Sequence, residues 1–202
     1  MLARCCNLLF GFASIGYNGV YSDTYYIQRV QEGDTACFAC LVDRYSQPVY
    51  ALINRIVQNR EEAEELTQDT WLKVFAHLSG FKQQSSFSTW LYRIAYNLAI
   101  SATRRRRQEC LPIDEAIIER VTEEDVDQWM GKGSNEESLV HLERALRLLS
   151  ADDRALILLF YWQQKTIEEL AEITEQKPTN VKVRLHRIRK KLYVILKGME
   201  DE

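Results

Sequence analysis

The sequence is poor in the two residue types that interrupt helices: 8 of its 202 residues are Gly and 3 are Pro. Together with the many Leu, Glu, Arg and Ala residues, this scarcity predicts an all-α fold. Apolar runs long enough to cross a bilayer are also missing, so we expect no membrane insertion. With 46% hydrophobic and 27% charged residues, the chain has the composition of a cytoplasmic globular protein, with room for one large or two small domains.

The five cysteines do not have the spacing of a disulfide framework or of a metal site. Cys37 and Cys40 form a CxxC pair, but no second pair and no pair of histidines accompanies it. We therefore expect core thiols in a reducing compartment, with no bound metal and no cofactor. The three histidines are scattered, so no catalytic set can be assembled from spacing, and we expect no enzymatic activity.

The formal net charge is only −3, but the charges are segregated along the chain. Acidic residues gather in residues 61–65 and 114–137, whereas basic residues gather in 104–107 and 177–197, the latter stretch containing no Asp or Glu. A polyanion responds to the local field rather than to the overall isoelectric point. The composition therefore leaves a nucleic-acid partner open.

Residues 1–20 are apolar but are interrupted by three Gly and two Asn residues. The stretch is too short and too broken for a membrane span, and its signal-peptide cleavage site is weak. We interpret residues 1–23 as a disordered leader or as the product of a start codon placed too far upstream.

The segment from Phe87 to Arg107 combines aromatics, an amide and cations on one predicted helix. At 3.6 residues per turn, one stripe is apolar and suits a core, namely Leu91, Ile94, Ala95, Leu98 and Ala102. The stripe beside it contains Trp90, Arg93, Asn97, Ser101 and Arg104. Indole faces stack on unpaired bases, guanidinium groups grip phosphates, and an amide reads base edges. The pattern favours a platform for single-stranded nucleic acid, although a helix with a core Trp and solvated arginines has the same pattern.

The helix before this platform is expected to start near Asn59, with an acidic first turn. Its apolar stripe consists of Trp71, Val74, Phe75 and Leu78, and a different face carries Glu65, Gln68, Asp69 and Leu72. The second face suits docking to a basic partner, and it equally suits a merely solvated surface. Upstream, Pro48 is expected to mark a bend or a helix boundary, and downstream, Ser86 or Ser88 is expected to cap the Trp90 helix.

Residues 108–138 are acidic and weakly periodic, which predicts a flexible linker with a transient helix around residues 116–121. Beyond it, Ser150-x-x-Asp153 and Thr166-x-x-Glu169 resemble capping boxes. Helices expected over 167–173 and 178–196 are separated by four residues, which is the arrangement of a helix-turn-helix.

The last predicted helix has two distinct faces. An apolar face, expected to point inward, consists of Val181, Leu185, Ile188 and Leu192. The opposite face and its borders carry Asn180, Lys182, Val183, Arg184, His186, Arg187 and Lys190. Such a helix suits the major groove, where side chains read base edges and Arg and Lys contact phosphates. A basic amphipathic helix that binds no DNA remains the alternative.

Taken together, the two halves resemble the extracytoplasmic-function (group IV) sigma factors, the promoter-recognition subunits of bacterial RNA polymerase. Region two of that family is matched by residues 65–72, 81–97 and 104–107, and region four by residues 166–172 and 180–187. The resemblance implies two small helical domains, at residues 24–107 and 139–197, joined by the acidic linker.

The resemblance also implies a role for each surface. Core RNA polymerase would be bound by Glu65, Gln68, Asp69 and Leu72. The melted non-template strand of the minus-ten element would be captured by Ser85, Ser86, Phe87, Trp90, Arg93 and Asn97, and the adjoining duplex by Arg104, Arg105, Arg106 and Arg107. The minus-thirty-five element would be read by the polar face of the last helix, and an anti-sigma factor is a further expected partner.

Lys177, Thr179, Asn180 and Val183 depart from the residues common in that family, so promoter sequences of other members do not transfer to this chain. Two other hypotheses stay open. A stand-alone helix-turn-helix regulator explains residues 139–196 but leaves the Trp90 segment without a role. A protein that sequesters a partner between two linked helical domains is the third possibility.

Overall fold

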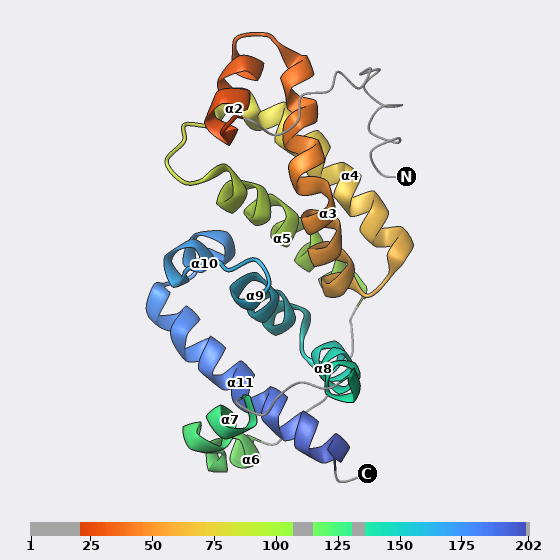
Figure 1. The fold of residues 1–202 in the computed structure, drawn as a ribbon, viewed down its shortest axis with the longest axis vertical. Coiled ribbons are helices and arrows are strands. Elements are labelled where there is room, and N and C mark those ends of the chain that lie inside the picture. The colour runs from red at the N-terminus through yellow and green to blue at the C-terminus, as the bar shows by residue number, and fades with distance from the viewer. Residues whose placement is uncertain (1–20, 107–114, 131–135, 201–202) are drawn as a thin grey trace. The chain divides into compact units, whose positions relative to one another are not determined.

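The computed structural model describes residues 21–106, 115–130 and 136–200, and every regular element in these ranges is a helix (Figure 1). The chain divides into two compact units, residues 1–102 and 103–202. The predicted all-α fold with two helical domains is therefore confirmed. The predictions made for residues 1–20 lie outside the described residues.

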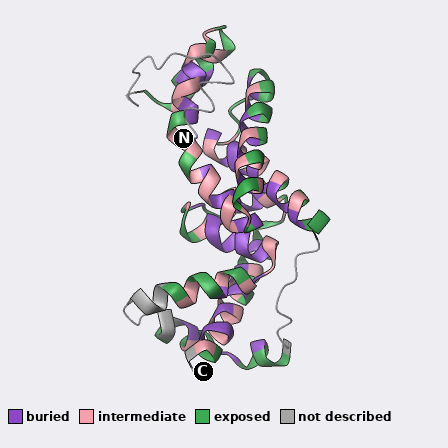
Figure 2. Cartoon of the chain, turned by 90° about the vertical axis from the view of Figure 1, so that its right-hand side faces the viewer, coloured by how far each residue is buried: buried purple, intermediate pink, exposed green. Residues whose placement is uncertain are grey.

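The first unit is built around two long helices that pack against each other, α3 (Phe38–Val57) and α4 (Arg60–His77) (Figure 1). Their contact is aromatic where α3 begins and α4 approaches its end, since Phe38 meets Trp71 and Phe75 edge to face at centroid distances of 5.8 and 5.0 Å. The remaining elements of the unit are α2 (Asp23–Gln31), η1 (Thr35–Cys37), η2 (Leu78–Gly80) and α5 (Phe87–Arg106). Burial alternates along these helices, with buried faces turned inward (Figure 2).

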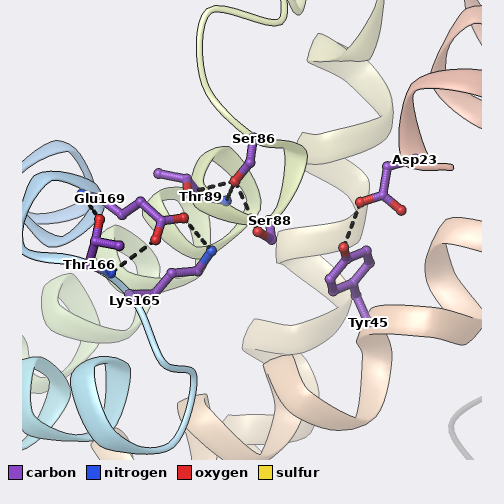
Figure 3. Close-up of polar contacts among 8 residues, drawn as sticks. All are labelled: Asp23, Tyr45, Ser86, Ser88, Thr89, Lys165, Thr166 and Glu169. Atoms are coloured by element: carbon purple, nitrogen blue, oxygen red, sulfur yellow. Dashed lines mark hydrogen bonds and ion pairs between the residues drawn. The ribbon is translucent and has the colours of Figure 1, made fainter.

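Helix α2 is fastened to α3 by one carboxylate. Asp23 accepts a 2.6 Å hydrogen bond from the Tyr45 hydroxyl (Figure 3). It also forms an ion pair with Arg44. Burial, and then the hydrogen bond to Asp23, raise the pKa of Tyr45 well above its ordinary range. At the other end of α2, Gln31 donates to the carbonyl of Leu78 at 2.9 Å, which ties α2 to η2.

The sequence predicted a bend or a helix boundary at Pro48. Helix α3 continues without interruption through this residue, so the boundary is wrong. Leu41 and Val49, on either side of the proline, are both fully buried at 0% exposure. Proline removes one backbone hydrogen bond and crowds the preceding turn. The apolar face packed against α4 outweighs that loss, because it runs across the proline on both sides.

The helix starts predicted around the acidic face and the Trp90 segment are confirmed. Asn59 caps α4 by accepting a 2.9 Å hydrogen bond from the amide of Glu62. Ser86 caps α5, since its hydroxyl accepts from the amide of Thr89 at 3.1 Å (Figure 3). Both caps satisfy amide groups that a helix start leaves unpaired.

The buried face of α5 differs in part from the predicted stripe. Leu91 and Ala95 are fully buried as expected, but the other three members of that stripe, Ile94, Leu98 and Ala102, are only half-buried. The core side is centred instead on Tyr92, Tyr96, Ala99 and Ile100. A tyrosine buries a large ring while its hydroxyl keeps a polar character, so hydrophobic spacing alone undervalues it. Burial raises the pKa of Tyr92 to about 12.

The second unit is assembled on its longest helix, α11 (Pro178–Glu200) (Figure 1). Against it pack α6 (Glu115–Arg120), α7 (Glu123–Met130), α8 (Glu136–Leu148), α9 (Ala151–Tyr161) and α10 (Ile167–Thr174). Residues 116–121, where the sequence predicted a transient helix within a linker, are largely covered by α6, which packs against α11, whereas α7 was not predicted. The buried side chains of this segment are Ile118 in α6, Val121 between the two helices and Val126 in α7.

Helix termini in the second unit are satisfied by side chains. Thr166 and Glu169 form the predicted capping box (Figure 3). The carboxylate of Glu169 also accepts a 2.7 Å hydrogen bond from the ammonium group of Lys165. The buried guanidinium of Arg154 closes the end of α8 by donating to the carbonyls of Leu146 and Leu149 at 2.8 and 2.7 Å. Burial lowers the pKa of Arg154 to about 10.

Candidate nucleic-acid interfaces

The start of α5 presents a tryptophan supported from beneath by other aromatics. The Trp90 ring lies 4.8 Å from that of Phe81, at an interplanar angle of 31°, and 6.0 Å from that of Phe87. Phe81 and Phe87 are buried, whereas Trp90 is half-buried. The cluster holds the indole in one orientation at the surface, which suits stacking on an unpaired base.

Phe87 itself does not offer the surface that the sequence predicted. Its exposure is 3%, and its ring packs 5.6 Å from that of Tyr45. It therefore supports Trp90 from the core rather than contacting a nucleic-acid strand. The hydroxyl of Ser86 is likewise engaged in holding the helix start, through Thr89 at 2.8 Å and Ser88 at 3.0 Å, while Ser85 beside it is half-buried.

The polar stripe that follows Trp90 reaches solvent along the length of α5. Arg93 is half-buried, and the stripe continues through exposed Asn97, Ser101 and Arg104. The two next arginines, Arg105 and Arg106, are exposed as well, and the prediction for Arg107 lies outside the described residues. A half-buried aromatic, an amide and a cationic end thus lie in sequence along one helix, as a strand-binding surface requires.

The acidic face of α4 is separate from its core face. Thr67, Thr70 and Trp71 are buried, and both threonine hydroxyls donate to carbonyls four residues earlier at 2.6 and 2.7 Å. On the other side lie exposed Glu65, half-buried Gln68, exposed Asp69 and Leu72, the last with 48% exposure. Two carboxylates surrounding an exposed leucine form a patch suited to a protein partner that is both apolar and basic.

Helices α10 and α11 form the predicted helix-turn-helix. The inward residues of α11 are confirmed, since Val181, Leu185, Ile188 and Leu192 are exposed by no more than 8%. On the opposite side, Asn180, Lys182, Val183 and Arg187 are exposed, and His186 and Lys190 are half-buried. Pro178 occupies the first helical position, where its missing amide hydrogen costs no hydrogen bond.

Arg184 has a structural partner that the sequence did not indicate. Its Nε donates to the buried carboxylate of Asp153 at 2.8 Å, and Lys191 donates to the other carboxylate oxygen at 2.9 Å. Burial raises the pKa of Asp153, but hydrogen bonds from Lys191 and Arg184 outweigh it, and the pKa is lowered overall. The network joins α9 to α11, so Arg184, predicted to lie at the border of the DNA-binding face, also anchors α11 to α9.

Asp153 had been interpreted as the second half of a capping box. Ser150 does cap α9, accepting from the amide of Asp153 at 3.2 Å, but the carboxylate of Asp153 turns to α11 instead. Glu123 on α7 is a second residue without a sequence signal, and it lies 3.5 Å from His186 on the exposed side of α11. Neither contact has a local pattern, because each joins helices far apart in the chain.

Comparison with known families matches both units. The sigma-70 region 2 family matches residues 41–109, and the sigma-70 region 4 family matches residues 139–192. These two matches, in this order, define the class: a sigma-70-type protein with a region 2 that contains the Trp90 helix and a region 4 that contains the helix-turn-helix.

Individual relatives narrow the class. The chain is 33% identical over 174 residues to the ECF RNA polymerase sigma factor SigW of Bacillus subtilis (strain 168), covering 82% of this chain and 92% of that protein. It is 30% identical over 177 residues to the ECF RNA polymerase sigma-E factor of Escherichia coli (strain K12), covering 83% of this chain and 91% of that protein. The chain therefore belongs to the extracytoplasmic-function (ECF) sigma factors, which direct transcription initiation.

Solved structures agree with this assignment. The sigma factor RpoE of Bartonella quintana, solved with the anti-sigma factor NepR, matches with a TM-score of 0.60 and 26% identity, covering 79% of this chain and 96% of that one. CnrH, solved with the cytosolic domain of CnrY, matches with a TM-score of 0.63 and 19% identity, covering 87% and 97% of the two chains, and supports the fold. None of the described helices combines the length and apolar character that crossing a bilayer requires.

Proposed function

We propose that this chain is a cytoplasmic, non-enzymatic initiation factor that binds core RNA polymerase through α4 and promoter DNA through α5 and α11. The observation that best supports this function is the surface patch of Glu65, Gln68, Asp69 and Leu72, which lies on the side of α4 opposite its core residues. None of these four side chains belongs to the buried core of the first unit. The patch gives an initiation factor the protein-binding surface that a simple DNA-binding regulator does not need.

In the proposed complex, α5 holds the melted non-template strand of the minus-ten element. An unpaired base stacks on the indole of Trp90, whose orientation is fixed by Phe81 and Phe87. Asn97 offers an amide to a base edge, and Arg93 with the exposed arginines 104–106 neutralises backbone phosphates. The Ser86 cap supports this surface by fixing the first turn of the helix.

Helix α11 takes the duplex of the minus-thirty-five element in its major groove. Asn180, Lys182, Val183 and Arg187 are exposed on the reading side, with His186 and Lys190 at its border. Arg184 holds α11 against α9 through Asp153 and so orients the reading side. Anti-sigma factors occur with the structurally matched sigma factors, and we extend this type of partner to the present chain.

Binding to purified bacterial core RNA polymerase, measured with and without Asp69→Arg, tests the proposal and needs no knowledge of the promoter. The reversal places a cation where a basic partner docks, so we expect at least about ten-fold weaker binding. Asp43→Arg is the matched control, because Asp43 is an exposed residue of α3 and undergoes the same change of charge. Its affinity should remain within about two-fold of the unmodified protein, as for other charges outside an interface.

Two outcomes would contradict the proposal. Equal losses from both variants would show that charge, rather than the α4 patch, controls binding. A folded protein that binds duplex DNA but not core polymerase would instead be a stand-alone helix-turn-helix regulator.

A further inference from the structure

Val183 is an apolar side chain in an unexpected place. It is 61% exposed, the highest value among the large hydrophobic residues that are exposed in the described part of the chain. It lies on the reading side of α11, opposite the buried residues Val181 and Leu185. Its exposure therefore contributes nothing to the core, and an exposed valine is also an indifferent helix former.

The surroundings of Val183 are polar and suited to DNA. Asn180, Val183 and Arg187 all line one shallow hollow of about 410 Å³ on the surface of the second unit. The three residues follow helical spacing, so they present an amide, an isopropyl group and a guanidinium in succession along one face. Arg184 and Lys191 also line the hollow, but Asp153 holds both at its base.

The C5-methyl of thymine is the one methyl group that the four bases present in the major groove, since cytosine has only a hydrogen at C5. A polar side chain at position 183 could exchange hydrogen bonds with several base edges, whereas valine can do so with none. Burying Val183 against the amino group of cytosine or adenine would leave that donor without a partner, which is unfavourable. A thymine methyl is the one base-edge group that gains from the contact.

We propose that Val183 is a specificity-determining residue that packs on a thymine methyl in the minus-thirty-five element. The inference rests on the proposed function, since it requires α11 to occupy the major groove of promoter DNA. Valine suits this task because its branched side chain is stiff at χ1 and loses little freedom on contact. The minus-thirty-five element of this factor therefore contains a thymine that is read through its methyl group.

Deoxyuridine isolates this contact, because it keeps the base pairing and hydrogen-bonding edge of thymidine and lacks only the methyl group. Holoenzyme formed from the full chain and core polymerase is first used to select promoter duplexes from a library randomised over the minus-thirty-five element. Each thymine of the selected element is then replaced singly by deoxyuridine, and the dissociation constants are compared. We expect one position at which the replacement weakens binding about four-fold, the value for one buried methyl or methylene group.

Val183→Ser should bind thymine and deoxyuridine equally at that position, with a ratio of dissociation constants of about one. The short polar side chain of serine cannot bury the methyl group of thymine. Val140→Ser is the matched control, because Val140 is also an exposed helical valine, at 54%, and lies on α8. It should retain the four-fold ratio. The ratio, unlike the affinity itself, does not respond to a general loss of folding.

The outcomes separate the two proposals. Selection of a promoter element without deoxyuridine sensitivity at any position, or with sensitivity that survives Val183→Ser, overturns the thymine contact and leaves the sigma-factor roles intact. Failure of the holoenzyme to form, or to select any element, overturns both.

Discussion

At the scale of single residues, the most consequential side chain outside the DNA-binding surface is Asp153. Asp153 is almost fully buried, and it accepts hydrogen bonds from Arg184 and Lys191. These two ion pairs join α9 to α11. A buried carboxylate is tolerated only when its charge and its acceptor positions are satisfied. Asp153 therefore fixes the position of α11 against α9.

Replacing Asp153 by Asn keeps its size but removes the charge that both cations require. We expect the second unit to lose about 2 kcal/mol of stability, within the range for hydrogen bonds to a charged group. Amide hydrogen exchange at neutral pH should report the loss as reduced protection of α9 and α11. Glu168→Gln, which neutralises an exposed carboxylate on α10, should leave the protection unchanged. Equal protection in both variants would show that the network contributes no net stability.

The same network predicts a pH dependence with a defined sign. The pKa of Asp153 in the folded protein lies below its ordinary value of 3.8, so as the pH falls the unfolded chain takes up the proton first. The stabilisation is therefore fully present above about pH 4 and is lost as the pH falls through the lower, folded-state pKa. Calorimetry of the second unit's transition from pH 7 to pH 3 should show this loss, and Asp153→Asn should lack that component. An identical acid response in both proteins would remove Asp153 as its source.

At the scale of secondary-structure elements, local signals predicted where helices start and were weaker on which faces they bury. The caps at Asn59, Ser86 and Thr166 are contacts between residues three apart, so the sequence alone contains them. The boundary expected at Pro48 failed because packing against α4 is a non-local effect. Helix α7 was missed for the same reason, since its buried Val126 depends on α11 rather than on its own acidic sequence.

The same distinction between local signals and tertiary packing applies to the candidate site. The exposure of Asn97, Lys182 and Arg187 and the partial exposure of Trp90 followed from helical spacing. The burial of Phe87 and the pairing of Arg184 with Asp153 did not, because each is decided by a neighbouring helix. Sequence periodicity therefore predicted which polar faces reach the surface, while tertiary contacts decided which side chains of each face are buried or paired.

Pro48 gives this distinction an energetic test. In Pro48→Ala, the new amide hydrogen can donate to the carbonyl of Arg44, one turn earlier in a helix that already exists. A proline inside a helix destabilises the folded protein by about 3 kcal/mol. It also restricts the unfolded chain, which offsets up to about 1 kcal/mol of this loss. We therefore expect Pro48→Ala to be more stable than the unmodified protein by about 2 kcal/mol. Denaturant unfolding of the first unit, followed by hydrogen exchange of α3 peptides, measures the gain. A destabilised variant would show that the ring of Pro48 is needed for packing.

At the scale of the whole molecule, the overall charge of −3 conceals the organisation that matters. The acidic patch lies on α4 in the first unit, and the basic reading helix is α11 in the second. The order of motifs along the chain predicted this separation of the acidic and basic surfaces, because each motif lies within one unit. Two separate cores then allow one surface to change without disturbing the other.

Trp71→Ala tests that separation. Trp71 is 2% exposed and packs edge to face on Phe38, so its removal should destabilise the first unit by about 4 kcal/mol, as for other buried tryptophans. Hydrogen exchange should then show lost protection in α3 and α4, with α9 and α11 as protected as before, because the second unit has its own buried residues, including Leu156, Leu159 and Ile188. Parallel loss of protection in both units would mean that they fold as one cooperative body. Retained protection of α11 would instead mean that damage to the core of the first unit leaves the second unit folded, as two independently folded units require.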